Sequence, residues 1–190
     1  MTGKIRITAG TFKNKSLAVP NGDSVRPTSD RARQALFNRL EHSFSDTGFK
    51  LRGARVVDLF AGTGALGLEA LSRGASHVTF VEHDRTSLAV LKRNIATLGV
   101  DDKSAVLTMD ATALPAASQP YDLALLDPPY EQGLAEPALA ALAGKQWLTK
   151  RAVVAVETAS GETITAPAGL TIEDTRSYGR GAITYLLGDA

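Results

Sequence analysis

Hydrophobic and polar positions follow two alternating periods along most of this chain of 190 residues. Short apolar runs, which are typical of buried strands, lie near residues 55–60, 77–82, 104–109, 121–127 and 151–157. Between these runs, helical spacing of apolar residues is found near residues 65–73, 84–99, 111–117 and 134–148. Alternating strands and helices predict a mostly parallel sheet with helices on both of its faces.

The pattern changes at both ends of the chain. Residues 4–8 and 16–19 alternate polar and apolar positions on either side of a turn-rich stretch, which predicts a small β-hairpin. Residues 170–176 and 182–187 are strand-like runs joined by Ser177–Gly181. They predict an antiparallel hairpin that closes the sheet.

A helix is expected between the first hairpin and the sheet. Pro27, followed by Thr28 and Ser29, is a helix-start signal. The apolar residues that follow share one helical face: Ala32, Ala35, Leu36, Leu40 and Phe44. We expect this helix to cover an edge of the main sheet. The hairpin then forms an extension over residues 1–24, and one domain spans residues 25–190.

Composition excludes several kinds of site. Hydrophobic residues make up 44% of the chain and charged residues 22%, which is ordinary for a soluble globular domain. The chain has no cysteine, so disulfides, thiolate catalysis and cysteine-bound zinc are excluded. Its histidines, His42, His77 and His83, lack metal-ligand spacing, and no metal site is expected. No signal pattern and no apolar run near the ~18 residues of a membrane span are present, so we expect a cytoplasmic protein.

Charge is distributed unevenly. Residues 1–55 carry 11 Lys and Arg against 4 Asp and Glu, whereas residues 56–190 carry 10 against 16. A basic N-terminal arm on an acidic body indicates a polyanionic partner, and the alternative is a solvated basic edge. The candidate polyanion-binding residues are Lys4, Arg6, Lys13 and Lys15 on the hairpin and Arg31 and Arg33 on the helix. For Arg39 we favour a solvated position.

A glycine-rich stretch, Asp58-Leu-Phe-Ala-Gly-Thr-Gly-Ala-Leu-Gly67, joins the first strand of the sheet to its helix. Gly62, Gly64 and Gly67 have the spacing of a nucleotide-binding turn, in which the ligand approaches the main chain. Glu82 ends the next strand, where a carboxylate can accept hydrogen bonds from ribose hydroxyls. These residues indicate a nucleoside-containing cofactor. The alternative is a tight turn without a ligand.

A second motif, Asp127-Pro-Pro-Tyr130, follows the strand at 121–127. Because ligands of open α/β sheets bind beyond the carboxyl ends of the strands, this motif is expected beside the glycine turn. Two prolines remove N–H donors, which leaves the Asp127 carboxylate and the Pro128 carbonyl as acceptors. Acceptors next to the Tyr130 ring suit a planar base with an exocyclic amine. A proline-rich turn closed by a buried tyrosine is the structural alternative.

These motifs resemble those of S-adenosylmethionine-dependent amino-methyltransferases. Arg26-Pro-Thr-Ser-Asp-Arg31 and Leu36-Phe-Asn38, taken with Asp127–Tyr130, are similar to the signature of the RsmD family. The resemblance extends from about Arg6 to the C-terminal hairpin. It implies a Rossmann-like class I methyltransferase fold, with a mostly parallel seven-stranded sheet, an antiparallel C-terminal hairpin and an N-terminal hairpin extension. It also implies methyl transfer to the N2 amine of a guanine in 16S ribosomal RNA, guanine 966 in standard numbering.

The resemblance implies a role for each motif residue. Asp58 and the backbone from Phe60 through Ala61 and Gly62 to Gly64 would hold the methionine end of the cofactor. The other implied cofactor contacts are Glu82 at the ribose, Asp110 and Ala111 at the adenine, and His83, Arg26 and Thr28. The implied catalytic residues are Asp127, Pro128, Pro129 and Tyr130.

Three alternatives remain at the level of the sequence. They are an adenine-N6 methyltransferase acting on DNA or RNA, a nicotinamide-dependent oxidoreductase, and a non-catalytic RNA-binding protein. Asp127 alone does not choose guanine over adenine, and its use as a base or only as an acceptor stays open. The expected substrate is 16S RNA or a small-subunit assembly particle, and the protein is expected to be a monomer.

Overall fold

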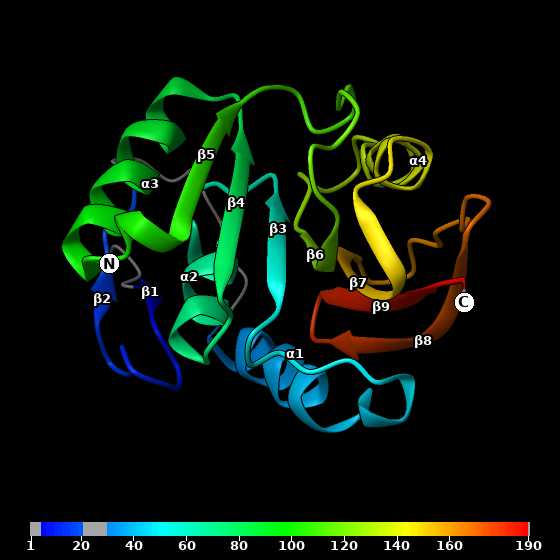
Figure 1. Ribbon diagram of the computed structural model, residues 1–190, viewed down its shortest axis with the longest axis horizontal. Coiled ribbons are helices and arrows are strands. Elements are labelled where there is room, and N and C mark those ends of the chain that lie inside the picture. The colour runs from blue at the N-terminus through cyan, green and yellow to red at the C-terminus, as the bar shows by residue number, and fades with distance from the viewer. Residues whose placement is uncertain (1–4, 21–29, 190) are drawn as a thin grey trace.

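A computed structural model describes residues 5–20 and 30–189 (Figure 1). Its helices are α1 (Asp30–His42), α2 (Ala65–Ser72), α3 (Arg85–Leu98) and α4 (Ala135–Gly144), with 3-10 turns at Ser45–Thr47 and Asp101–Lys103. Its strands are β1 (Ile5–Arg6), β2 (Ser16–Leu17), β3 (Arg55–Leu59), β4 (His77–Glu82), β5 (Ser104–Thr108), β6 (Tyr121–Leu126), β7 (Leu148–Ala159), β8 (Leu170–Tyr178) and β9 (Gly181–Gly188).

Within these described ranges, seven strands form one sheet in the order β5-β4-β3-β6-β7-β9-β8. All neighbours are parallel except where β9 pairs with β7 and β8. The expected Rossmann-like sheet and antiparallel C-terminal hairpin are confirmed. The chain leaves β3 toward β4 on one side and later returns to β6 on the other. The carboxyl ends of β3 and β6 therefore form the topological switch point at which such sheets bind ligands.

Both faces of the central sheet are buried, because successive side chains of a strand point to opposite faces. Val56 and Leu123 pack in one apolar cluster with side chains of α1, α2, α3 and the N-terminal hairpin. Val57 and Ala124 pack in a second cluster with side chains of α4. The clusters leave the strand ends as the place where polar groups can gather.

Helix α3 shows how local sequence sets an element. The Asp84 carboxylate accepts a hydrogen bond from the Ser87 N–H at 2.8 Å and caps the first turn. Leu88, Leu91 and Ile95 form its buried stripe, as the spacing predicts. Gly99 ends the helix at φ 66°, a left-handed conformation that glycine adopts without strain.

The structure corrects three expectations about elements. Residues 111–117 form turns rather than a helix, because Asp110 binds the Thr112 N–H and the Pro115 carbonyl accepts from the Trp147 indole at 2.7 Å. Helix α4 ends at Gly144 rather than near residue 148, and Leu148 already belongs to β7. Finally, α1 covers a face of the sheet instead of an edge, since Leu36 and Leu40 share a cluster with residues of β3, β6 and β7.

The predicted N-terminal hairpin is present, with Ile5 opposite Leu17 and Arg6 opposite Ser16. It is bound to the main sheet's helices. Ile5 and Leu17 are buried in the same cluster as the central strands. The Thr11 N–H donates to the Ser72 carbonyl at 2.8 Å. The boundary expected near residue 24 lies outside the described residues, and the two-part division stays a prediction.

Candidate active site

The two sequence motifs meet at the carboxyl ends of two central strands of the sheet. Strands β3 and β6 are neighbours, and Leu59 pairs with Leu126 at their carboxyl ends. Phe60 begins the glycine turn directly after β3, and Asp127 follows β6. The structure therefore brings the glycine turn and the Asp127–Tyr130 motif side by side, as expected for two motifs that follow the carboxyl ends of strands.

The backbone of the glycine turn is unusual from its first residue. Phe60 has φ 59°, a left-handed value that costs a non-glycine residue conformational energy and tends to occur at functional sites. Gly62 and Gly64 follow at 54° and 81°. A Cβ on Gly64 would lie 2.5 Å from Leu91, whereas a Cβ on Gly62 would meet nothing closer than 3.9 Å. Gly64 is required by packing, and the open space at Gly62 lets a ligand approach the main chain.

Asp58 lies under this turn with an exposed fraction of only 1%. Its carboxylate accepts the Gly67 N–H at 2.9 Å, at the start of α2. Burial raises the pKa of Asp58 well above its ordinary value, the Gly67 hydrogen bond opposes that rise, and the nearby charges of Asp127 and Glu82 add to it. A ligand ammonium group here would relieve the unfavourable burial of negative charge.

Glu82, at the end of β4, is anchored beside the same turn. One carboxylate oxygen accepts the Gly62 N–H at 2.8 Å, and the other accepts the N–H groups of His83 and Asp84 at 2.7 and 2.8 Å. A carboxylate offers about four lone-pair sites, so Glu82 keeps acceptor capacity for a ligand hydroxyl. The His83 imidazole is largely exposed, with Nδ1 3.9 Å from Glu82. Ribose binding by Glu82 and a cofactor contact by His83 stay predictions.

Asp110 and Ala111 follow β5 at the same sheet edge. Asp110 is exposed, and its pKa is lowered mainly by the Thr112 N–H and also by the Thr112 hydroxyl. Ala111 is buried under the turn. Asp110 caps a single turn rather than a helix, and an adenine contact by Asp110 and Ala111 stays a prediction.

The Asp127–Tyr130 motif presents groups of different exposure. Asp127 is half-buried, Pro128 is buried and Pro129 is exposed. The Tyr130 side chain reaches the surface with 39% of its area exposed, and its hydroxyl donates to Glu157 at 2.8 Å. The structural alternative, a turn closed by a buried tyrosine, is not found, because the ring keeps an accessible area that a base could cover.

Two residues near the site were missed by the sequence analysis. Asn94 of α3 is buried and donates to the carbonyls of Thr63 and Ala18 at 2.9 and 3.1 Å, so it links the glycine turn to the N-terminal segment. Glu157 is a carboxylate that directly follows the buried apolar run 152–156 of β7. Each is a polar residue at a position where the periodicity demands an apolar one, and that mismatch is the signal that could have found them.

The expected polyanion-binding residues divide into three groups. Arg6, Lys13, Lys15 and Arg31 are exposed, as an RNA contact requires. Lys4, together with the expected cofactor contacts Arg26 and Thr28, lies outside the described residues. For Arg33 the expectation is wrong, because its side chain is 0% exposed.

Arg33 is buried because carboxylates on two elements bind it. Its guanidinium lies 2.7 Å from Asp30 and 3.5 Å from Glu69, and it also donates to the Arg6 carbonyl. Arg39 is not solvated either. It pairs with Asp174 at 2.8 Å and stands over the Tyr185 ring, 4.9 Å from its centroid.

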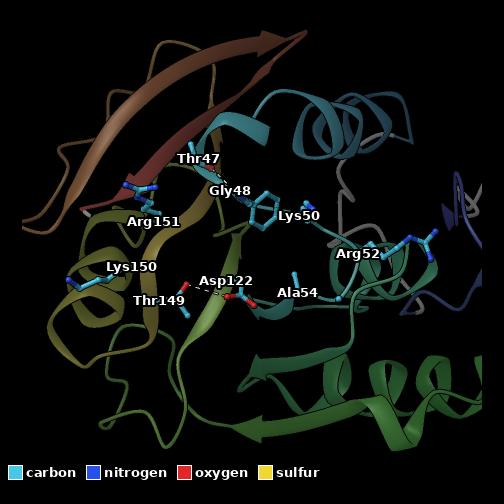
Figure 2. Close-up of a pocket in the computed structure, with 11 residues that line it drawn as sticks. Thr47, Gly48, Lys50, Arg52, Ala54, Asp122, Thr149, Lys150 and Arg151 are labelled. Atoms are coloured by element: carbon cyan, nitrogen blue, oxygen red, sulfur yellow. Dashed lines mark hydrogen bonds between the residues drawn. The ribbon is translucent and has the colours of Figure 1, made fainter.

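A hollow of about 350 Å³ lies at the opposite edge of the sheet (Figure 2). Its lining includes Lys50 and Arg52 before β3, Asp122 near the start of β6, and Lys150 and Arg151 near the start of β7. Asp122 accepts the Arg55 N–H at 2.9 Å and the Thr149 hydroxyl at 3.3 Å. These groups lie at the amino ends of the strands, so the hollow is separate from the candidate active site.

None of the helices in residues 5–20 and 30–189 is both long and apolar enough to cross a membrane.

Comparison with known proteins identifies the family. A family described as Conserved hypothetical protein 95 matches residues 5–187. The chain is 35% identical to ribosomal RNA small subunit methyltransferase D of Haemophilus influenzae over 181 residues, 93% of this chain and 90% of the relative. Its identity to the protein of the same name from Escherichia coli K12 is 38% over 156 residues, 82% of this chain and 75% of the relative.

A solved structure agrees with the sequence relatives. The Escherichia coli protein yhhF superposes with a TM-score of 0.83 at 34% identity, covering 99% of both chains. The resemblance inferred from the motifs is therefore confirmed over nearly the whole chain. The chain belongs to the family described as Conserved hypothetical protein 95, the family of ribosomal RNA small subunit methyltransferase D.

Proposed function

We propose that this protein transfers a methyl group from S-adenosylmethionine to the exocyclic N2 amine of a guanine in 16S ribosomal RNA, guanine 966 by family resemblance. One observation carries the proposal: the glycine turn after β3 and the Asp127–Tyr130 motif after β6 lie on adjacent parallel strands. The choice of RNA as substrate rests on the relatives, which are named as methyltransferases of small-subunit ribosomal RNA. Since ribosomal RNA is the proposed substrate, we place the protein in the cytoplasm, acting as a monomer on RNA or on an assembly particle.

The residues around Gly62 fit a methionine-type ligand. A buried carboxylate at Asp58 with a raised pKa favours a neighbouring ammonium, and the open space at Gly62 admits a ligand to the main chain. Glu82 retains acceptor capacity for ribose hydroxyls. S-adenosylmethionine supplies an electrophilic methyl group on a positively charged sulfur.

The chain's own residues then act on the target amine. The Asp127 carboxylate and the Pro128 carbonyl would accept hydrogen bonds from the NH2 group, which would localise the nitrogen lone pair and direct it toward the methyl. The Tyr130 ring offers a face for the base. Catalysis would come mainly from holding nitrogen and methyl carbon at ~3–3.5 Å in line with the departing sulfur. The base must first be unstacked from the RNA.

The decisive experiment measures methyl transfer to unmodified small-subunit RNA and to assembly particles, with the modified nucleoside identified. N2-methylguanosine is the expected product. Formation of N6-methyladenosine would instead support the adenine alternative. A protein that binds NAD but does not bind S-adenosylhomocysteine would support the oxidoreductase alternative.

Variants of the motif test the residue roles. Asp127→Ala and Tyr130→Ala are expected to lower turnover by about 100-fold or more while S-adenosylhomocysteine affinity changes little, because they meet the base. Asp127→Asn separates two roles of the carboxylate: it keeps an acceptor but cannot take up the amine proton. If Asp127→Ala binds S-adenosylhomocysteine much more weakly but still turns over at a near-normal rate once the cofactor is saturating, Asp127 serves cofactor binding and not the chemical step.

A further inference from the structure

The Tyr130 ring is held at both of its ends. Its Cα belongs to the motif loop after β6, and its hydroxyl donates to Glu157 Oε1 on β7 at 2.8 Å. Glu157 is itself embedded in the sheet, with 9% of its surface exposed and Ile183 of β9 as its register partner. An accessible aromatic side chain is thus tied to a fixed, nearly buried acceptor.

Gly181, the first residue of β9, provides the space for this contact. A Cβ at residue 181 would lie 3.0 Å from the Tyr130 hydroxyl oxygen and 3.4 Å from Glu157 Oε1. Gly181 does not occupy the left-handed region, so its backbone does not demand glycine. What demands a small residue here is the hydrogen-bonded pair itself.

We propose that Glu157 and Gly181 are positioning residues that set the plane of the Tyr130 ring against which the target guanine stacks. The inference rests on the proposed function, because it deepens the role of the same site. The tyrosine hydroxyl oxygen lies on the Cβ–Cγ axis, so an acceptor there fixes the direction of that axis. It also favours one plane of the ring, because a phenolic O–H donates best within the plane of its ring. The stacked base inherits that orientation, and with it the direction in which its amine points toward the methyl carbon.

The hydroxyl anchor matters because the attack geometry is narrow. A displacement of about 1 Å at the reacting atoms can cost roughly 100-fold in rate. Glu157 also lies on the strand next to β6, so the anchor couples the motif loop to the sheet and not to another loop. Loss of the anchor should therefore affect the chemical step and leave the cofactor side of the pocket intact.

The test compares variants that keep or remove the hydrogen bond. Glu157→Ala and Tyr130→Phe are each expected to lower kcat by about 10- to 100-fold, with unchanged affinity for S-adenosylhomocysteine and an RNA KM within about threefold. Glu157→Gln retains an acceptor oxygen and should restore most of the turnover. Gly181→Ala should lower kcat less, because the hydroxyl has to move only a few tenths of an ångström.

A double-mutant cycle isolates the contact itself. If the two side chains act through one hydrogen bond, Glu157→Ala combined with Tyr130→Phe should be no slower than the worse single variant. Glu173→Ala, which removes an exposed carboxylate from β8, is the matched control and should leave kcat unchanged. Thermal melting with and without S-adenosylhomocysteine establishes that each variant is folded.

The outcomes separate this inference from the proposed function. A folded wild-type protein that forms no N2-methylguanosine contradicts the proposed function. A wild-type protein that forms it, with Glu157→Ala and Tyr130→Phe equally active, overturns the positioning role. The positioning role is also overturned if the loss of kcat in the double variant equals the product of the losses in the two single variants. Should Glu157→Ala unfold, Tyr130→Phe and Glu157→Gln decide the matter, since neither removes buried volume.

Discussion

The Nε atom of Arg33 lies 3.5 Å from Oε2 of Glu69, and both side chains are fully buried. Glu69 also accepts the Thr8 N–H and hydroxyl at 2.7 and 2.6 Å and pairs with Arg73 at 2.8 Å. One carboxylate on α2 therefore holds a residue of α1, the residue that caps the C-terminus of α2 and the segment after β1. The basic N-terminal region is in part an internal structural element.

Glu69→Ala is expected to lower the free energy of unfolding by about 3–5 kcal/mol, because it leaves two buried arginines without their shared acceptor. Denaturant unfolding monitored by circular dichroism measures the change. Glu41→Ala is the matched control: Glu41 also binds Arg73, at 3.1 Å, but is 31% exposed, and its loss should cost under about 1 kcal/mol. Equal effects of the two substitutions would contradict the shared-acceptor role.

Deleting residues 1–19 is expected to abolish cooperative thermal unfolding. The deletion removes buried Ile5, Ile7 and Leu17, and it strips Glu69 and Ser72 of their backbone donors. Such a truncation cannot report on RNA binding alone. A truncated protein that melts cooperatively and binds S-adenosylhomocysteine would contradict this expectation and restore the view of the hairpin as a separable extension.

RNA contacts by the arm are better tested by removing charge. Arg6, Lys13 and Lys15 are exposed, so replacing all three by alanine should leave the melting temperature nearly unchanged. Each lost phosphate contact should lower the salt dependence of RNA affinity by about 0.7–0.9 in the log–log slope. Alanine at Lys92, Arg93 and Lys103 removes equal charge elsewhere and serves as the control. An unchanged slope for the hairpin variant rules out phosphate contacts there.

Asp58→Asn is expected to stabilise the protein at neutral pH in the absence of cofactor. The folded-state pKa of Asp58 is raised above its ordinary value of 3.8, chiefly by burial, so the folded protein binds the proton more tightly than the unfolded chain. The stability this provides is complete below pH 3.8 and is lost as pH rises through the folded pKa. Asparagine avoids that loss and can still accept the Gly67 N–H.

Unfolding free energies of wild type and Asp58→Asn, measured across a pH series, check this prediction. The advantage of the variant should shrink as pH falls toward 3.8, and cofactor affinity should fall because an ammonium partner is gone. A wild-type protein that gains stability relative to the variant as pH rises would reverse the sign and contradict the pKa assignment.

Glu82→Ala should weaken S-adenosylmethionine binding by about 1–3 kcal/mol, the usual cost of losing a charged hydrogen-bond partner. Titration calorimetry measures the affinity. Because Glu82 also holds the Gly62 and His83 N–H groups, the variant's melting temperature must be measured beside it. His83→Ala is the milder comparison, since His83 is 67% exposed. Unchanged affinity in folded Glu82→Ala would remove Glu82 from the cofactor site.

Periodicity predicted most of the fold because the strands and helices are defined by residues close in sequence. The strand at 77–82 is predicted to the residue, and the rule that ligands bind beyond the carboxyl ends of parallel strands correctly predicts the glycine turn beside Asp127. The failure at 111–117 has a specific cause. Its backbone groups bond to Asp110 and to Trp147 from a distant turn, and local spacing carries no information about such partners.

The sequence by itself determined the alternating pattern, the turn chemistry and the two motifs, because each depends on residue type and spacing alone. Only the tertiary structure decided which polar residues are exposed. Arg33 shares the buried face of α1 with Leu36, Phe37 and Leu40, and its charge is tolerated there because Glu69, 36 positions away in the sequence, packs against it. Tyr130 and Glu157 are 27 residues apart, and they meet because β6 and β7 are neighbours in the sheet. Burial and pairing of charge depend on the element packed opposite, and only folding brings that element into place.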